Sequence, residues 1–376
     1  MSAQDVTVDA LVARLRNPDT ELALLDVREE GQFGEGHMLW AVNLPYSRLE
    51  AGVRALVPRR AAPVVLVDDG DGVAPRAARR LATLGYTSLH VLAGGVAAWA
   101  AAGHPLFHGV YVPGKVLGEW AEARYATPSI DAQQLLRLQA AGRPVRILDP
   151  RTEAEHTARH VPGAWSCPNG ELLYRQAWRD LPPDSLIVVA CGGRTRGIVG
   201  AQTLIDADVG HPVAALQDGN HGWQLAGLTL AQGLARRAEA PVGADRREAG
   251  RALARRHGVP QIDPARLRAW QADPTRTLYL LDVRDPAAYA RGHLPGAVNA
   301  PGGQLVQASD RWLGTLRARV VLVDDDGIRA VQSALWLRRL GWEASALHAS
   351  ADALTQGAAS QPAADAADAP AAVGAA

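Results

Sequence analysis

The chain has 376 residues, enough for two or three domains, and 48% of them are apolar, which is typical of a globular protein with buried cores. Lys and Arg number 39 and so do Asp and Glu, so the chain lacks the basic excess of a nucleic-acid-binding protein and we expect no nucleic-acid partner. No apolar stretch is long enough to span a membrane, residues 1–11 lack a signal-peptide pattern, and two cysteines suit a reducing cytosol, so we expect a cytoplasmic protein without a membrane partner.

The N-terminal part of the chain alternates helix-like stretches with short apolar runs. In chain order the pattern predicts a helix over 7–16, strands over 22–27 and 64–67, a helix over 74–84, a strand over 89–92 and a short helix holding Trp99. Strands separated by helices at this spacing are typical of a parallel sheet covered by helices on both faces. The pattern therefore predicts the α/β class.

The same pattern occurs three times. Each copy has an Asp, an Arg two residues later, a His eleven residues after the Asp and a Pro nineteen residues after it. A further marked position, 42 residues after the Asp, follows a β-branched apolar run. The matching sets are Asp26, Arg28, His37, Pro45 and Asp68; Asp149, Arg151, His160, Pro168 and Cys191; and Asp282, Arg284, His293, Pro301 and Asp324. Shared offsets in three copies indicate three tandem domains.

The repeat divides the chain into predicted domains at 1–106, 128–232 and 260–350. Segments 107–127 and 232–259 link them. The third copy lacks the Gly-rich turn and Trp that end the other two, so we expect it to be incomplete at its C-terminal end. Residues 352–376 show no core pattern and are predicted to be a disordered tail.

One cysteine stands where parallel sheets bind ligands, beyond the carboxyl end of a strand. Cys191 follows the predicted strand 186–190 and precedes the predicted helix 198–205. The glycines that follow Cys191 let the loop curl so that backbone N–H groups point inward, and such a ring at a helix N-terminus favours a thiolate. Arg194 and Arg196 add two positive charges that can bind an oxyanion. The pattern predicts a nucleophilic cysteine in an anion-binding loop.

These residues resemble the rhodanese family of sulfurtransferases in tandem form, and the resemblance covers nearly all of the chain except the tail. It rests on four motifs of the second copy: Asp149-Pro150-Arg151, Glu155 with His160-Val161-Pro162-Gly163-Ala164, Cys191-Gly192-Gly193-Arg194-Thr195-Arg196, and Gly219 with Trp223. The resemblance implies a parallel five-stranded sheet flanked by helices in each domain. It also implies that the six residues from Cys191 to Arg196 form the active loop.

The reaction that the resemblance implies is sulfur transfer by a thiosulfate:cyanide sulfurtransferase. Cys191 takes the outer sulfur of a small-molecule donor such as thiosulfate, becomes a persulfide, and passes the sulfur to cyanide or a thiol, for which a protein can also serve. Two loop arginines favour the thiosulfate dianion over 3-mercaptopyruvate. No cofactor is expected, and no metal, because no His or Cys cluster has zinc spacing.

The chain departs from the family pattern in all three copies. Asp68 and Asp324 stand where the nucleophile belongs, and a carboxylate cannot form a persulfide and repels thiosulfate, so the first and third domains are predicted to be silent. The first copy reads Met38-Leu39-Trp40-Ala41 where the family has a Pro-Gly-Ala ending. In the second copy, His156 replaces an aromatic residue and Arg159 a glycine.

Other residues of the second copy have plainer interpretations. Asp149, Arg151 and His160 recur in the copies without a nucleophile, so we expect structural roles, with a salt bridge from Arg151 to an acidic residue such as Glu155. Cys167 has no basic neighbours and is expected to be a packing residue, with a resolving thiol as the alternative.

Two other functions remain open at this stage. The two degenerate copies suit a non-enzymatic sulfur carrier or scaffold in which the silent domains bind partners. A cysteine phosphatase or arsenate reductase is less favoured, because that class has five residues between its cysteine and arginine. Here four residues separate Cys191 from Arg196, and Gly197 stands at the phosphatase position.

Overall fold

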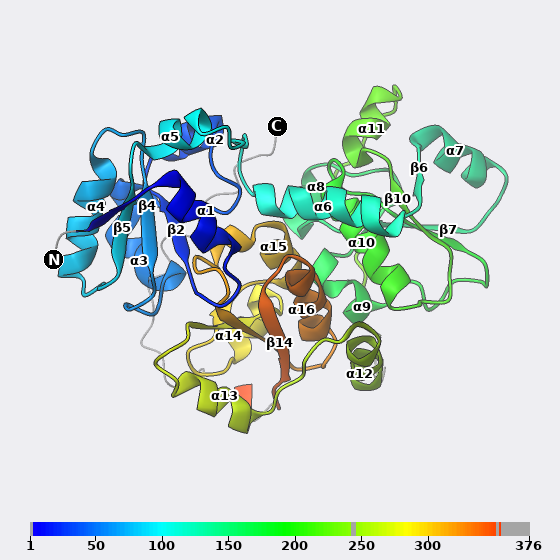
Figure 1. The fold of residues 1–376 in the computed structure, drawn as a ribbon. Coiled ribbons are helices and arrows are strands. Elements are labelled where there is room, and N and C mark those ends of the chain that lie inside the picture. Colours follow the sequence, from blue (N-terminus) through cyan, green and yellow to red (C-terminus); the bar gives the residue numbers. More distant parts are fainter. Residues whose placement is uncertain (1–2, 242–245, 351–352, 355–376) are drawn as a thin grey trace.

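A computed structural model describes residues 3–241, 246–350 and 353–354, and the chain folds into three lobes (Figure 1). Each lobe is one copy of the repeat, and we number the domains 1 to 3 in chain order. The predicted tail, residues 352–376, lies outside the described residues except for 353–354.

Domain 1 has a five-stranded parallel sheet in the order β1-β5-β4-β2-β3. Its strands are β1 (Gln4–Val6), β2 (Ala23–Asp26), β3 (Val42–Asn43), β4 (Val64–Val67) and β5 (Leu89–Leu92). Its helices are α1 (Val8–Arg16), α2 (Glu30–Glu35), α3 (Leu49–Leu56), α4 (Val73–Thr83) and α5 (Gly95–Ala101), with a 3₁₀ turn η1 (Tyr46–Arg48). Neighbouring strand residues such as Leu24 and Leu25 enter separate apolar clusters, because successive side chains point to opposite faces of a sheet.

Domain 2 repeats this order as β6-β10-β9-β7-β8, again five parallel strands. Its strands are β6 (Ser129–Ile130), β7 (Val145–Asp149), β8 (Trp165–Ser166), β9 (Leu186–Val189) and β10 (Val213–Leu216). Its helices are α7 (Ala132–Ala140), α8 (Glu153–Ala158), α9 (Leu172–Arg175), α10 (Thr195–Asp206) and α11 (Gly219–Leu225), and η2 (Asn169–Glu171) is a 3₁₀ turn. The predicted α/β class with flanking helices is confirmed.

Domain 3 differs from the five-stranded expectation, because its described sheet has four strands in the order β12-β11-β13-β14. They are β11 (Leu278–Asp282), β12 (Val298–Asn299), β13 (Arg319–Asp324) and β14 (Glu343–His348). Beside β14, where the other domains have a fifth strand, Gln261 forms a single parallel bridge with Ala346. The helices are α13 (Pro264–Gln271), α14 (Pro286–Arg291), α15 (Gly302–Gln307) and α16 (Arg329–Arg339), with η3 (Ser309–Arg311).

The predicted linking segments contain two helices, α6 (Val112–Tyr125) and α12 (Arg246–His257). Leu117 and Ala121 of α6 and Leu253 of α12 belong to an apolar cluster that also contains residues of domains 2 and 3. A Cβ on Gly250 of α12 would lie 1.9 Å from the carbonyl oxygen of Gly327, so α12 packs directly on the first turns after β13. The two segments are thus parts of the core.

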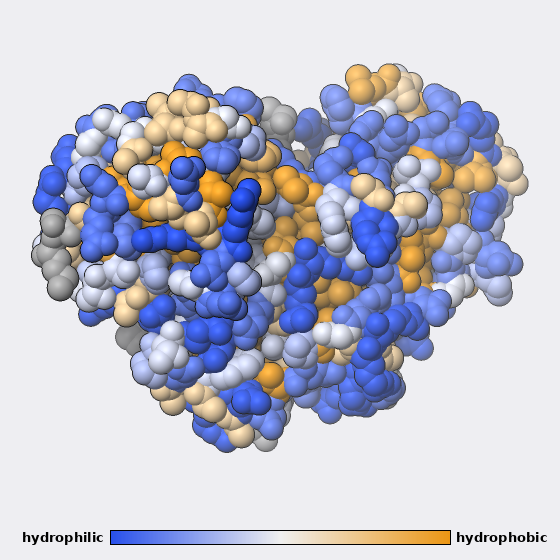
Figure 2. Space-filling model, viewed as in Figure 1, coloured by the Kyte–Doolittle hydropathy of each residue, from blue (hydrophilic) through white to orange (hydrophobic). Residues whose placement is uncertain are grey.

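Domain 3 contacts both other domains. Trp336 of α16 donates to the Thr203 hydroxyl of α10 at 2.8 Å, so the helix that follows β13 lies against the helix that follows β9. On its other side, Thr277 donates its backbone N–H to Glu21 of domain 1 at 2.7 Å. On the face in Figure 2, polar side chains cover most of the lobes and apolar residues gather between them. None of the helices in the described ranges is long and apolar enough for a transmembrane span.

Candidate functional site

Strand β9 carries Cys191 to the carboxyl edge of the domain 2 sheet, and we call residues 191–196 the Cys191 loop. The chain leaves the strand at Val189 and enters α10 at Thr195, so the helix begins three residues earlier than predicted. Cys191 is 2% exposed, whereas Gly193 and Arg194 are exposed. The thiol therefore lies at the base of a loop whose outer residues face solvent.

The start of α11 holds the Cys191 loop from the other side. Asn220 donates its backbone N–H to the Cys191 carbonyl at 2.7 Å, and His221 donates to that of Gly192 at 3.1 Å. A Cβ on Gly219 would lie 2.1 Å from the Cys191 carbonyl oxygen, and its φ of +51° is left-handed. Only glycine fits this approach, which explains the glycine of the Gly219 and Trp223 motif.

The electrostatic surroundings of Cys191 act in two directions. Burial raises the pKa of the Cys191 thiol above its ordinary value. The Arg196 guanidinium and backbone hydrogen bonds from Gly197 and Gly193 lower it, but they do not outweigh burial. The sequence analysis predicted a stabilised thiolate; the inward N–H groups are present, but the net shift has the opposite sign because the thiol is so deeply buried.

Domains 1 and 3 fill the same backbone ring with a carboxylate. Asp68 accepts from the N–H groups of Gly70 and Ala74, both at 2.9 Å. Asp324 accepts from Gly327 at 3.0 Å and Ala330 at 2.9 Å. The second donor of each pair stands six residues after the aspartate, as Gly197 does after Cys191. The turn binds a carboxylate in domains 1 and 3, and in domain 2 the Cys191 thiol takes the same place.

Arg196 lies beside the thiol but is held by Glu155. Its Nη1 and Nη2 donate to the two carboxylate oxygens of Glu155 at 2.8 and 2.7 Å. Glu155 also forms a capping box with Thr152 at the start of α8. The helix therefore holds the Glu155 carboxylate in place, and this carboxylate orients Arg196. The contacts of Arg196 and Thr152 hold the pKa of Glu155 below its usual range despite burial, which raises it.

Arg194 does not accompany Arg196 toward the thiol. Its guanidinium pairs with Glu119 of α6 at 3.1 Å and bonds to Glu122 of the same helix. Thr195 packs on α6 as well, since a Cβ on Gly118 would lie 2.8 Å from its methyl carbon. The sequence analysis expected Arg194 to bind an oxyanion together with Arg196, and in the structure its guanidinium instead meets two carboxylates of α6.

A chain of hydrogen bonds runs from the Cys191 loop into domain 3. The Asn169 side chain donates to the Arg196 carbonyl at 3.0 Å. The Gln332 side chain of α16 in turn donates to the Asn169 carbonyl. Sequence reasoning missed both residues, because no spacing signal connects η2 with α16.

The Asp-x-Arg pair has one geometry in all three domains. Arg151 donates Nε and Nη2 to Asp149 at 2.9 and 2.6 Å. The expected salt bridge from Arg151 to Glu155 is wrong: Asp149 lies closer along the chain and Glu155 binds Arg196. Each repeat histidine also stacks on the ring of the residue four positions before it, and the centroid distances are 3.8 Å for Phe33 and His37, 3.9 Å for His156 and His160, and 3.9 Å for Tyr289 and His293. Such repetition suits structural roles.

His156 adds a contact that the other domains lack. Its Nδ1 lies 3.0 Å from Asp149 Oδ2, where domain 1 has Phe33. Burial raises the pKa of Asp149, but the His156 and Arg151 contacts outweigh it and lower that pKa. Burial prevails at Asp26, whose pKa is raised. The replacement of an aromatic residue by His156 therefore keeps the stacking and adds a hydrogen bond.

Cys167 has the environment of a packing residue. It is fully buried in the apolar cluster of domains 2 and 3, and burial raises the pKa of its thiol to about 12. Both cysteines are free thiols. Within the described ranges, no group of three or more His, Cys, Asp or Glu side chains is arranged to hold a metal ion.

The chain is similar to known proteins both in sequence and in structure. A family model, the rhodanese-like domain, matches residues 7–102, 131–226 and 263–355, which is more than half of the chain. The chain is similar to the crystal structure of thiosulfate sulfurtransferase from Pseudomonas aeruginosa, with 44% identity and a TM-score of 0.88 over 94% of this chain and 67% of that one.

Two curated proteins match shorter stretches. The HTH-type transcriptional regulator Rv0324 of Mycobacterium tuberculosis is 37% identical over 115 residues, which are 31% of this chain and about half, 47%, of the regulator. The uncharacterized protein YibN of Escherichia coli K12 is 32% identical over 97 residues, 26% of this chain and 67% of YibN. With a rhodanese-like match in each of its three domains, the chain belongs to the rhodanese family.

Proposed function

We propose that the protein is a sulfurtransferase that takes the outer sulfur of thiosulfate onto Cys191 and passes it to cyanide or a thiol acceptor. Domains 1 and 3 are silent in this proposal, because their loops carry Asp68 and Asp324 in place of the nucleophile. The observation that carries the proposal is the Cys191 loop itself, with its thiol inside a ring of N–H groups beside Arg196. The 44% identity to the Pseudomonas thiosulfate sulfurtransferase supports it.

The proposed reaction has two displacement steps. In the first, the Cys191 thiolate attacks the outer sulfur of thiosulfate, the sulfur–sulfur bond of the donor breaks, and sulfite leaves with the bonding electron pair. Cys191 then carries a persulfide anion in the backbone ring. In the second step, cyanide attacks the outer sulfur and leaves as thiocyanate, and the Cys191 thiolate is regenerated. No oxidant or reductant is consumed, and no cofactor takes part.

The residues around the thiol have separate tasks in this scheme. Backbone N–H groups of Gly193 and Gly197 stabilise the negative sulfur in both the thiolate and the persulfide. Arg196 attracts the donor dianion and favours the charged sulfur. Because Glu155 binds both ends of the Arg196 guanidinium, the side chain is already oriented before the donor arrives.

The direct test is intact mass spectrometry after incubation with thiosulfate. We expect the wild-type chain to gain the mass of one sulfur atom and Cys191→Ser to gain none. A Cys167→Ser variant is the matched control and should still gain one sulfur, because Cys167 lies in the core. An unmodified wild-type chain, or sulfur retained in Cys191→Ser, would contradict the proposal.

Turnover distinguishes an enzyme from a stoichiometric sulfur carrier. With thiosulfate and cyanide in excess, an enzyme releases thiocyanate continuously, whereas a carrier gives one burst per chain. We expect continuous release.

The proposal also includes a location in the cytoplasm. Both cysteines are free thiols, and free thiols suit a reducing compartment.

A further inference from the structure

The guanidinium of the Asp-x-Arg pair is fixed in the same orientation in each domain. Its Nε and Nη2 atoms donate to the partner aspartate at 2.9 and 2.6 Å in all three cases, namely Arg28 to Asp26, Arg151 to Asp149 and Arg284 to Asp282. Nη2 also donates to a carbonyl at the end of the next helix, that of Gly36, Arg159 or Gly292. The one remaining end of each guanidinium, Nη1, therefore points in an equivalent direction.

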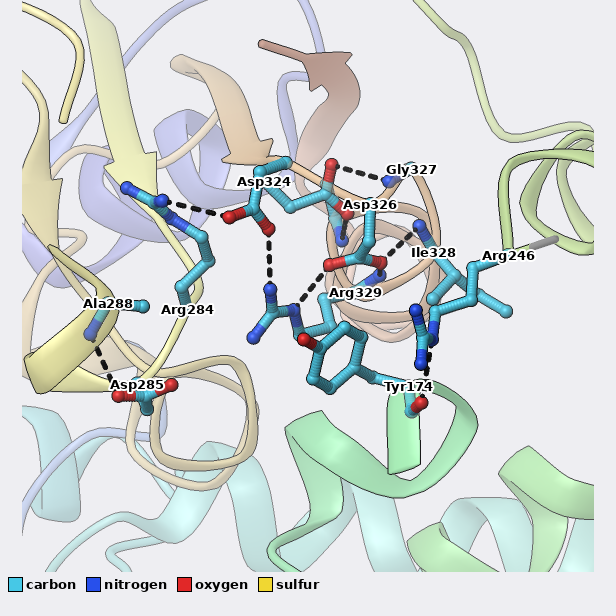
Figure 3. A network of polar contacts seen from close by, with 12 residues as sticks. Tyr174, Arg246, Arg284, Asp285, Ala288, Asp324, Asp326, Gly327, Ile328 and Arg329 are labelled. Atoms are coloured by element: carbon cyan, nitrogen blue, oxygen red, sulfur yellow. Dashed lines mark hydrogen bonds and ion pairs between the residues drawn. The ribbon is translucent and has the colours of Figure 1, made fainter. Parts of the chain in front are cut away.

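In domains 1 and 3, Nη1 binds a carboxylate from the loop. Arg28 Nη1 donates to Asp69 at 3.0 Å, and Arg284 Nη1 donates to Asp325 at 3.2 Å. The side chains of Asp69 and Asp325 are 41% and 38% exposed, so they lie at the mouth of the loop rather than inside the domain. Figure 3 shows the Arg284 guanidinium reaching toward the carboxylates of the domain 3 loop.

In domain 2 the same loop position is Gly192, which has no side chain to offer. A Cβ there would lie 3.8 Å from Arg151 Nη1 and 3.9 Å from Arg196 Nη2. Among the residues that the structure describes, none accepts a hydrogen bond from Arg151 Nη1. Arg151 Nη1 and Arg196 Nη2 therefore both lie at Gly192, directly beside the residue that carries the thiol, and of the two Arg196 Nη2 is already bonded to Glu155.

We propose that Arg151 is a second anion-binding residue of the Cys191 site, with Nη1 binding the oxyanion group of the sulfur donor in front of Gly192. The carboxylates of Asp69 and Asp325 show what this guanidinium edge binds in the other two domains. A sulfonate-type group, such as that of thiosulfate, has the negative oxygens to replace them. This inference rests on the proposed function and names a residue that was expected to be only structural.

The first test puts the missing carboxylate back. Gly192 does not have a left-handed φ and its added Cβ meets no atom closer than 3.7 Å, so both Gly192→Asp and the isosteric neutral Gly192→Asn fit. We expect the KM for thiosulfate in Gly192→Asp to exceed that in Gly192→Asn at least about 10-fold, the value of one charge-assisted hydrogen bond. Equal KM values in the two variants would overturn the inference.

The second test compares two matched arginines. Arg151→Lys and Arg284→Lys each weaken one buried pair of the same geometry, but only the first lies at the Cys191 loop. We expect similar losses of thermal stability, a KM for thiosulfate raised at least about 10-fold in Arg151→Lys, and no change in KM in Arg284→Lys. A fall in kcat with unchanged KM in Arg151→Lys would assign it a structural role and overturn the inference. If Arg151→Lys does not fold, the comparison of KM between Gly192→Asp and Gly192→Asn tests the inference.

A binding measurement separates this inference from the proposed function. Sodium sulfate should slow alkylation of Cys191 by neutral iodoacetamide in the wild type, and the sulfate concentration needed should rise at least about 10-fold in Arg151→Lys and Gly192→Asp. This readout needs no sulfur transfer. If sulfate protects through Arg151 but thiosulfate leaves no sulfur, the proposed function fails alone. If sulfur is transferred and Arg151→Lys changes neither KM nor protection, the inference fails alone.

Discussion

The Cys191 loop and its counterpart in domain 3, residues 324–329, share a backbone turn but differ in what the turn binds. In domain 3 the ring of N–H groups is filled by Asp324, and Arg329 stands where domain 2 has Arg196. Arg329 is 2% exposed, bonds to Asp326 at 2.6 Å and Glu171 of domain 2 at 3.2 Å, and lies 3.9 Å over the Tyr174 ring (Figure 3). The Cys191 loop exposes Gly193 and Arg194, and the domain 3 loop is a contact between domains.

The comparison shows how an anion-binding turn is reused. A carboxylate completes the ring in domain 3 and the Cys191 thiol completes it in domain 2, and in the proposed function only the thiol takes part in sulfur transfer. In domain 3 the charges are satisfied within the chain: burial lowers but the neighbouring carboxylates raise the pKa of Arg329, and the net shift is upward. In domain 2 the guanidinium of Arg196 has one carboxylate partner, Glu155, whose side chain is 33% exposed. The ion pair of domain 2 is thus partly exposed, whereas Arg329 of domain 3 is buried among its partners.

The largest expected effect comes from making the two loops alike. Cys191→Asp places a carboxylate in the ring of Gly193 and Gly197, as Asp68 and Asp324 do in theirs. We expect a folded protein whose thiocyanate formation falls at least about 1,000-fold, because no persulfide can form. Thiocyanate assay and circular dichroism measure the two properties. Residual activity above one-tenth of wild type would show that another group carries the sulfur.

The next effect is on stability and contrasts the two arginines at one loop position. Arg329→Met leaves Asp326 buried without its arginine and removes one of the two arginines that pair with Glu171, and we expect a loss of about 3–5 kcal/mol in the free energy of unfolding. Arg196→Met should cost about 1 kcal/mol or less, since its ion pair with Glu155 is partly exposed. Denaturant unfolding measures both. Equal losses would show that the two positions do not differ as the contacts indicate.

A smaller effect is expected on donor binding and on the pH dependence of the thiol. Arg196→Ala should raise the KM for thiosulfate about 10- to 100-fold through loss of a charged hydrogen-bond donor. Burial raises the pKa of Cys191 and Arg196 lowers it, so removal of Arg196 should move the alkylation midpoint to still higher pH. Iodoacetamide rates measured against pH test this sign. An unchanged KM, or a midpoint shifted to lower pH, would exclude the role given to Arg196.

The smallest effect concerns the second thiol. Cys167→Ala removes one buried sulfur atom from the core, and we expect a loss of about 1 kcal/mol in stability with kcat and KM for thiosulfate within twofold of wild type. Calorimetry and the thiocyanate assay measure these. A loss of turnover with an accumulating persulfide would instead identify Cys167 as a resolving thiol.

Local patterns predicted most of the fold because its strands are short, apolar and sharply bounded. The runs 64–67 and 89–92 are strands with those same ends, and the Asp offsets located the loop at Cys191. Helices α6 and α12 were not predicted. Glycines within α6 and the long charged stretches of α12 weaken the apolar stripe, and both helices exist because other domains cover them.

The arrangement inside the site depended on contacts that are distant in sequence. Arg194 and Arg196 are equivalent as loop charges, and only the carboxylates of α6 and α8 decide which one faces the thiol. The sequence analysis explained Gly192 only by the curl of the loop, whereas Asp69 and Asp325 at the same position of the other domains bind the arginine of the Asp-x-Arg pair. Both points needed side-chain geometry.

The most direct measurement moves the thiol to another loop of the same protein. In the double variant Asp68→Cys/Cys191→Ser, a cysteine enters the domain 1 ring, where Asp69 occupies Arg28 and Val73 stands in place of Arg196. After thiosulfate treatment, intact mass spectrometry should show one added sulfur on the wild type and none on this variant, although its new thiol reacts with iodoacetamide. Sulfur on the transplanted thiol at a comparable rate would contradict the claim that guanidinium groups beside the ring, and not the ring alone, make the loop reactive.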